Sequence, residues 1–222
     1  MKWNALLAEF IGVFGLCLIG IIAIHNLGSQ DGGLIGIALA HGLIITVLVA
    51  AYAAVSGAHF NPAVSFGMLL AKKISGAEFF AYVISQIAGG VVGSVVAMTA
   101  LGKEAVIAGT PALGAATTGT TGLIVEIIGT FFLVGVIFAV AVDKRSPGNA
   151  PMFIGLTIVA CILAFGPLSG CAINPARYLG PALVGGMSPN AWVWLVGPIL
   201  GGAIASLAYT LVFAEKSTES TS

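Results

Sequence analysis

The chain has 222 residues, of which 59% are hydrophobic and only 7% are charged, and its mean hydropathy is +1.10. Soluble domains carry about 25% charged residues, so this composition excludes an ordinary soluble domain and indicates an integral membrane protein. The formal net charge is zero, which leaves no basic excess to bind nucleic acid. The three cysteines are odd in number and scattered, which argues against a disulfide framework.

Six apolar runs are long enough to cross a hydrocarbon core about 30 Å thick. They cover approximately residues 5–24, 34–55, 79–101, 122–142, 150–168 and 191–213. The first run is long enough to remain as a span, and the residues before it lack the small-residue cleavage pattern of a signal peptide. The sequence therefore predicts an all-α protein that crosses the membrane six times.

The basic residues predict how the chain is oriented. If the N-terminus lies in the cytoplasm, only Lys103 falls outside and six basic residues fall on the cytoplasmic side. These six are Lys2, Lys72, Lys73, Lys144, Arg145 and Lys216. Because basic residues are enriched in cytoplasmic loops, both termini are expected to be cytoplasmic. Trp3, Trp192 and Trp194 stand at the ends of spans and fit an aromatic belt at the membrane interface.

A nine-residue segment occurs twice. Residues 56–64, SGAHFNPAV, and residues 169–177, SGCAINPAR, share Ser, Gly, Asn, Pro and Ala at matching positions, at an offset of 113 residues. Each copy contains an Asn-Pro-Ala box: Asn61, Pro62 and Ala63 in the first, Asn174, Pro175 and Ala176 in the second. Asn is a favoured helix N-cap and Pro fits the first helical position, so a helix begins at each box. The apolar run that follows lasts only about ten residues, roughly 15 Å of helix. We expect two half-helices that enter from opposite faces and meet near the midplane.

The long spans are repeated as well. Residues 9–14, EFIGVF, return in the fourth span as residues 126–131, EIIGTF. Because each half contributes three spans, an odd number, the second half must be inserted upside down relative to the first. The two inverted repeats cover about residues 1–110 and 118–214, and a polar tail follows at 215–222.

The paired boxes, the second followed by Arg177, resemble the signature of the aquaporin family, also called major intrinsic proteins. The resemblance extends from Glu9 to about Phe213. It implies a single channel domain over residues 1–222, with six transmembrane helices plus two half-helices in an inverted repeat of three spans and three. It also implies a multi-pass protein of the lipid bilayer, a homotetramer, with no cofactor and no enzymatic activity. We expect the plasma membrane as its location.

Passage is expected to be limited to water and other small neutral solutes. At the midplane the side-chain amides of Asn61 and Asn174 would donate to a passing water, and the carbonyls of residues 56–60 and 169–173 would accept along the path. Both half-helix N-termini carry partial positive charge, so a cation or a proton meets a barrier between them. The sequence therefore predicts a passive water channel that excludes protons and ions.

Arg177 is a charged residue within the membrane and so a functional candidate. In the aquaporin family the matching arginine forms an outer selectivity filter with three other positions, which by spacing from the boxes fall on His41, Ile162 and Cys171. His and Ile at the first two positions are similar to the tonoplast-type plant aquaporins, some of which pass ammonia as well as water. Cys171 would then be the target of a mercurial. The alternative for His41 is a core histidine bonded to a neighbouring helix.

The resemblance assigns supporting roles to three further residues. Glu9 and Glu126 would each accept hydrogen bonds from backbone amides of the box loop in their own half, and His59 would bind loop carbonyls at the cytoplasmic mouth. A proton relay through the two carboxylates and a gating role for His59 are the alternatives. No spacing of His, Cys, Asp or Glu suggests a metal site.

Two other functions stay open. One is a facilitator of glycerol or small polyols, although the Asp that follows the filter arginine in glycerol channels is Tyr178 here. The other is a secondary transporter, because inverted repeats and broken helices occur there too. The spans offer no further acid, Lys or Arg to bind a coupling ion. An enzyme is disfavoured, because no nucleophile is paired with a positioned base.

Overall fold

The computed structural model describes residues 2–214; the predicted polar tail at 215–222, with Lys216, lies outside the described residues. Within this part of the chain, six helices are long and apolar enough to cross a membrane. They are α1 (Trp3–Leu27), α2 (Gly33–Ser56), α4 (Gly76–Leu101), α6 (Gly119–Ile137), α7 (Ala150–Ser169) and α9 (Trp192–Ala208). α6 and α9 continue as the short π-helices η1 (Phe138–Val142) and η2 (Tyr209–Phe213). No strand occurs between residues 2 and 214. When η1 and η2 are counted with α6 and α9, each predicted span matches its helix to within three residues.

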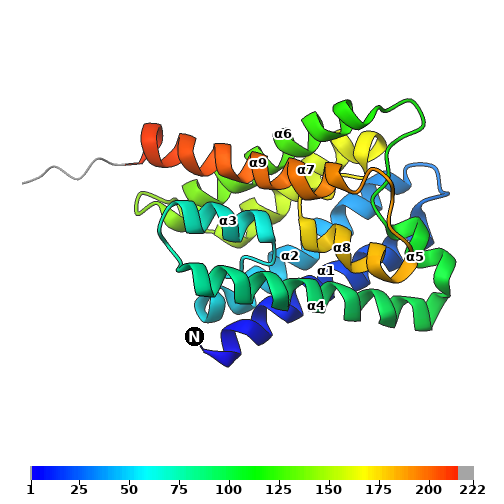
Figure 1. Ribbon diagram of the computed structural model, residues 1–222, viewed down its shortest axis with the longest axis horizontal. Coiled ribbons are helices and arrows are strands. Elements are labelled where there is room, and N and C mark those ends of the chain that lie inside the picture. The colour runs from blue at the N-terminus through cyan, green and yellow to red at the C-terminus, as the bar shows by residue number, and fades with distance from the viewer. Residues whose placement is uncertain (1, 215–222) are drawn as a thin grey trace, which may run out of the picture.

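Two short helices begin at the boxes. α3 (Pro62–Leu70) is capped by Asn61, whose side chain accepts a hydrogen bond from a backbone N–H of the first turn, and α8 (Pro175–Gly185) is capped in the same way by Asn174. Figure 1 shows that α3 and α8 enter the bundle from opposite ends, with their N-terminal ends toward the middle. The predicted half-helices are therefore present, in the predicted orientation to one another.

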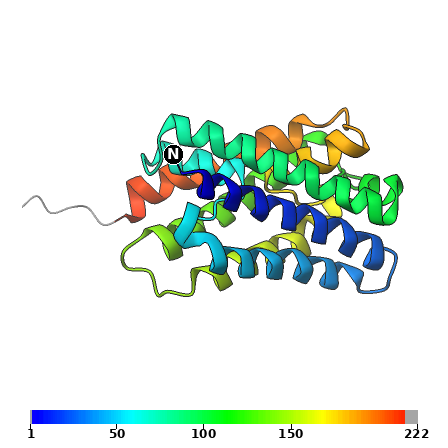
Figure 2. The ribbon, with the colours of Figure 1, turned by 90° about the horizontal axis from the view of Figure 1, so that it is seen from below.

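Matching glycines bring the long helices of each half together. A Cβ on Gly89 of α4 would lie 2.2 Å from the Phe10 carbonyl oxygen of α1. A Cβ on Gly201 of α9 would lie 2.3 Å from the Ile127 carbonyl oxygen of α6. Backbones can approach this closely only where a small residue stands at the crossing. Figure 2 shows the bundle from below, with α1 running alongside α4.

Each half-helix packs on a long helix of the other half. A Cβ on Gly90 of α4 would lie 2.9 Å from the Ala176 carbonyl oxygen of α8, and a Cβ on Gly202 of α9 would lie 2.7 Å from the Ala63 carbonyl oxygen of α3. The two repeats are thus interlocked rather than side by side, and the inverted three-plus-three arrangement is confirmed.

The glycine contacts predict a loss of stability that can be measured. We expect Gly89→Ala to lower the melting temperature of the detergent-solubilised protein, because overpacking a tight interior costs about 1–3 kcal/mol. Gly135→Ala is the matched control, since a Cβ on Gly135 of α6 meets nothing within 4 Å. Alanine there should leave the melting temperature unchanged or raise it. Equal melting temperatures for the two variants would contradict the packing at Gly89.

Two details differ from the sequence prediction. The connection between the halves contains a short helix, α5 (Lys103–Gly109), whose seven residues are too few to show a periodicity. Trp194 does not reach the membrane interface, because its ring is fully buried and stacked on Tyr178 with 4.7 Å between ring centroids. Trp3 and Trp192 are exposed, as an interfacial belt requires.

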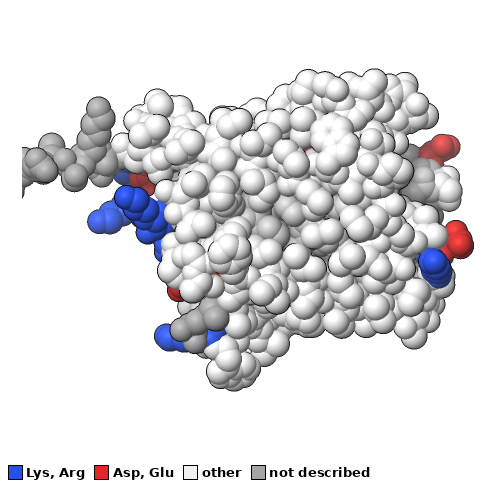
Figure 3. Space-filling model, in the orientation of Figure 1, with Lys and Arg blue, Asp and Glu red and all other residues white. Residues whose placement is uncertain are grey.

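Charged side chains gather at the two ends of the bundle, and the face between them is uncharged in the view of Figure 3. Basic residues follow α3 and η1, where the chain turns at the end that also holds the N-terminus. The end at α5 carries Lys103 beside Glu104. The prediction that both termini are cytoplasmic depends on this distribution of basic residues.

Candidate functional site

The two boxes meet in the middle of the bundle through a reciprocal pair of hydrogen bonds. Asn61 Nδ2 donates to the Ile173 carbonyl oxygen at 2.8 Å. Asn174 Nδ2 donates to the Phe60 carbonyl oxygen, also at 2.8 Å. Each Oδ1 accepts from the backbone N–H two residues further along, at 2.8 and 3.0 Å. These bonds fix the orientation of both amides and leave one N–H of each free to donate into the space between them.

The loop before each Asn has an unusual backbone conformation. Gly57 and Gly170, which end α2 and α7, have φ of 84° and 72°, where glycine alone is unstrained. Four other loop residues have φ between 42° and 50°: Ala58, Phe60, Cys171 and Ile173. This left-handed backbone conformation costs a residue that has a side chain roughly 1–2 kcal/mol. Such strain persists only where the surroundings hold the chain in place.

A buried glutamate holds each loop. Glu9 of α1 accepts hydrogen bonds from the backbone N–H groups of His59 (2.9 Å) and Phe60 (2.7 Å). It also accepts from the Ser56 hydroxyl at 2.6 Å. Glu126 of α6 makes the three corresponding bonds in the second loop, at 2.6–2.9 Å. Both side chains are 0% exposed, and a buried carboxylate is tolerated when it is hydrogen-bonded in this way. The geometry matches the supporting role expected for Glu9 and Glu126.

Three further side chains support the loops, and this role was not predicted for any of them from the sequence. Tyr82 of α4 and Trp194 of α9 each donate, at 2.8 Å, to the carbonyl oxygen of the serine that opens a loop. Gln86 of α4 donates to Glu9 at 2.7 Å. The usable signal was the repeat itself, because Tyr82 and Trp194 occupy equivalent positions in the third and sixth spans.

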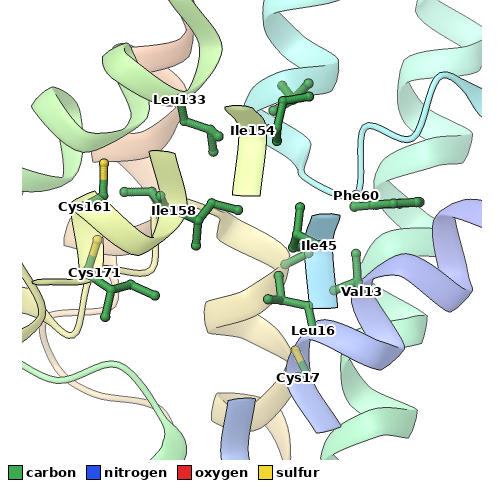
Figure 4. Packing of buried hydrophobic residues seen from close by; sticks show 14 of the residues in the cluster. Val13, Leu16, Cys17, Ile45, Phe60, Leu133, Ile154, Ile158, Cys161 and Cys171 are labelled. Carbon is green, nitrogen blue, oxygen red and sulfur yellow. The ribbon is translucent and has the colours of Figure 1, made fainter. Parts of the chain in front are cut away.

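A narrow cavity passes both boxes. Its volume is about 40 Å³, which is room for about three water molecules. The two loops and their asparagine amides form one wall. The other wall is apolar, and Figure 4 shows Leu133 and Ile158, from α6 and α7, facing Leu16 and Ile45, from α1 and α2. Between the boxes, a molecule in the cavity can therefore hydrogen-bond only to the loops and to its neighbours; at one end of the cavity His41 and Arg177 add polar groups.

A wider chamber lies at each end of the narrow cavity. The chamber nearer α5 has a volume of about 140 Å³ and shares His41, Ile162 and Arg177 with the narrow cavity. The chamber at the opposite end has a volume of about 350 Å³ and shares Val49 and His59. Because neighbouring cavities share lining residues, the three follow one another along the bundle, and we call this series of cavities the passage.

Arg177 stands beside His41 at the α5 end of the narrow cavity. Its Nη1 donates to the Gly109 carbonyl oxygen of α5 (3.0 Å), and its Nη2 lies 3.4 Å from His41 Nε2. His41 Nδ1 lies 2.8 Å from the Ile37 carbonyl oxygen. A carbonyl can only accept, so Nδ1 carries the proton, and Nε2 of the neutral ring presents a lone pair. A guanidinium can only donate, so this lone pair accepts from Arg177 Nη2.

The structure brings the four predicted filter residues together. His41, Ile162, Cys171 and Arg177 all line the narrow cavity, and they are only 3–6% exposed. His41 bonds a carbonyl of its own helix through Nδ1 and meets Arg177 of the neighbouring helix α8 through Nε2, and it lines the cavity as a filter residue would. Within residues 2–214, no group of three or more His, Cys, Asp or Glu side chains is placed to hold a metal ion.

His59 makes other contacts than those expected. Its ring Nδ1 bonds the Ser65 hydroxyl of α3 (3.0 Å), and its ring packs edge-on against Tyr82 with 5.2 Å between centroids. The expected bond from this side chain to a loop carbonyl is therefore wrong. The loop turns the imidazole toward the first turn of α3, where the serine hydroxyl supplies the partner.

The row of free carbonyls is also shorter than expected. In each loop the serine carbonyl accepts from Tyr82 or Trp194, and the carbonyl before the box accepts from the opposite asparagine. The carbonyls of residues 57–59 and 170–172 accept no hydrogen bond from the described part of the chain. These six are the acceptors that a molecule in the passage can use.

Six spanning helices in two inverted halves, with a passage lined by two re-entrant loops, define a membrane channel. Irregular backbone at membrane depth is tolerated only where it is buried in protein or lines a watery cavity.

The chain belongs to the major intrinsic protein family, whose family model matches residues 1–209. It is 38% identical to aquaporin TIP4-4 of Zea mays, over 95% of this chain and 86% of that relative. It is 40% identical to aquaporin TIP2-1 of Arabidopsis thaliana, over 95% and 87%. The fold is similar to the X-ray structure of the aquaglyceroporin from Plasmodium falciparum, with a TM-score of 0.86 and 26% identity over 95% of this chain and 96% of that one. The aquaporin resemblance and the fold class are thereby confirmed, and the family is one of channels for small neutral solutes rather than of enzymes.

Proposed function

We propose that this protein is a passive water channel that excludes protons and ions. The observation that carries the proposal is the narrow cavity, which has room for about three waters and passes between two asparagine amides of fixed orientation. Free carbonyls along one wall replace the hydrogen bonds that water loses on entry, and the apolar wall opposite binds nothing. Water can therefore move in file without being held.

Proton exclusion follows from the direction of the two amides. Asn61 and Asn174 each keep one N–H that points into the space between them. A water at this point gives its oxygen to both donors, so its two hydrogens point outward along the file. It cannot accept a proton from one neighbour while its oxygen is engaged by two amides. The N-termini of α3 and α8 add partial positive charge at the same place, which repels cations.

The α5 end of the cavity sets which other solutes enter. Arg177 repels cations, Ile162 makes the wall apolar, and His41 accepts from Arg177 and so helps to orient its guanidinium. Ammonia is close to water in size and can accept a hydrogen bond from an N–H of Arg177, so we propose ammonia as a second solute. Glycerol is the alternative solute, and the likeness to a structure titled an aquaglyceroporin supports it. A coupled transporter is disfavoured, because the buried acids Glu9 and Glu126 are already engaged by the loops.

The wider assembly follows the family pattern. We propose one channel domain built from repeats at about 1–110 and 118–214, one passage per subunit, a homotetramer, and cytoplasmic termini. Several of the relatives are TIP aquaporins, and they favour the tonoplast over the plasma membrane, which was the location expected from the sequence.

Stopped-flow light scattering on proteoliposomes tests the proposal. Under a sucrose gradient, the vesicles should shrink much faster than empty liposomes, while an internal pH dye should show no faster proton entry. An ammonium gradient and a glycerol gradient then separate the two candidate solutes. Ile158→Trp, which fills the narrow cavity from its apolar wall, is the control for vesicle leak. Proton entry as fast as water flux, or a water flux that saturates or needs a second gradient, would overturn the proposal.

A further inference from the structure

Gly20 of α1 lies beside the filter, and neither a left-handed backbone conformation nor a close approach of another backbone accounts for a glycine there. A Cβ built there would lie 2.4 Å from His41 Nε2, 3.0 Å from Cε1 and 3.1 Å from Cδ2. The three nearest atoms all belong to one imidazole. At Gly89 and Gly93 of α4, by contrast, the nearest atom is a backbone oxygen of α1. The space at Gly20 is therefore occupied by a side chain that lines the passage, and not by the backbone of a neighbouring helix.

The imidazole of His41 is confined on its other edges as well. Its Nδ1–H is bonded to the Ile37 carbonyl one turn earlier in α2, and Arg177 Nη2 approaches its Nε2. Only the cavity side of the ring is open, since His41 lines both the narrow cavity and the chamber nearer α5. Anything that pushes the Nε2 edge must either move the ring into the passage or break the bond to Ile37.

We propose that Gly20 is a positioning residue for the selectivity filter. The missing side chain at Gly20 makes the recess in which the His41 imidazole stands, and so sets both the free width beside Arg177 and the direction of the Nε2 lone pair. The inference rests on the proposed function only in taking His41 as part of the filter.

The test is a double-mutant cycle between Gly20→Ala and His41→Ala in proteoliposomes. Water permeability per inserted channel and the ammonia-to-water permeability ratio are measured for the four proteins. In the native background, Gly20→Ala should force the His41 side chain away from its preferred rotamer, and a strain of this kind lowers the water permeability about fivefold. It should also lower the ammonia-to-water permeability ratio. In the His41→Ala background the added methyl has room, so Gly20→Ala should change neither quantity.

Gly15→Ala is the matched control on the same helix, because a Cβ on Gly15 meets only the flexible end of Leu48, at 2.9 Å, and more distant Ile44 atoms. It should leave both quantities unchanged. If Gly20→Ala fails to insert but the double variant with His41→Ala inserts, this rescue of the folded yield supports a clash between the added methyl and the imidazole. Failure of both, an equal effect in both backgrounds, or no effect in either would overturn the inference.

The failure of this inference is distinguishable from failure of the proposed function. If His41→Ala changes the ratio and Gly20→Ala does not, the filter stands and the role of Gly20 falls. If the native protein carries protons or fails to carry water, the channel proposal falls whatever Gly20 does.

Discussion

Glu126→Ala is expected to eliminate water flux because the channel fails to fold. The change removes the acceptor of three buried hydrogen bonds, from the Ser169 hydroxyl and the backbone N–H groups of Ala172 and Ile173. Each buried donor left unpaired costs about 1–3 kcal/mol. Three of them cost several kcal/mol, against a typical stability of about 5–15 kcal/mol. The left-handed conformation at Cys171 and Ile173 also loses the contact that holds it.

The yield of folded protein by size-exclusion chromatography and the water permeability of the same sample check this prediction. Both should fall together. Glu104→Ala is the control, because Glu104 is an exposed acid on α5 and its removal should change neither quantity. A Glu126 variant that keeps its water flux and gains proton conductance would show instead that the carboxylate belongs to a proton relay.

A mercurial is expected to block water flux, and Cys171→Ser is expected to remove the block. Cys171 lines the narrow cavity together with His41 and Arg177, where the volume of about 40 Å³ leaves no room for both a mercury atom and a file of waters. Serine keeps the size of the side chain but does not bind mercury. The uninhibited Cys171→Ser protein should carry water about as fast as the native one.

The other two cysteines supply the controls. Cys17 and Cys161 are both buried, and neither lines the narrow cavity. Cys17→Ser and Cys161→Ser should therefore stay sensitive to the mercurial, with water permeability falling to nearly that of empty liposomes. If block persists in Cys171→Ser and disappears in one of these variants, the reactive thiol lies elsewhere and Cys171 does not face the passage.

The signals that predicted the spans and half-helices are local ones. Length and hydropathy define a span, and an Asn-Pro pair defines a helix start, so the predicted elements agree closely with the structure. The two repeats then predicted the inverted arrangement and, with the family resemblance, the pairing of each box loop with Glu9 or Glu126. The predictions failed for the side chains of His59 and Trp194 and for α5, where no local pattern exists.

The sequence by itself therefore determined that this is a six-span membrane protein of two inverted halves, with a box at the start of each half-helix. Only the tertiary structure decided how those boxes are held and what lies beside them: the crossed bonds of Asn61 and Asn174, the supports from Tyr82 and Trp194, and the approach of Arg177 to His41. The physical reason is that these bonds join residues far apart in the chain. Their partners are selected by which backbone groups are left unpaired when the helices pack, and that is known only after packing.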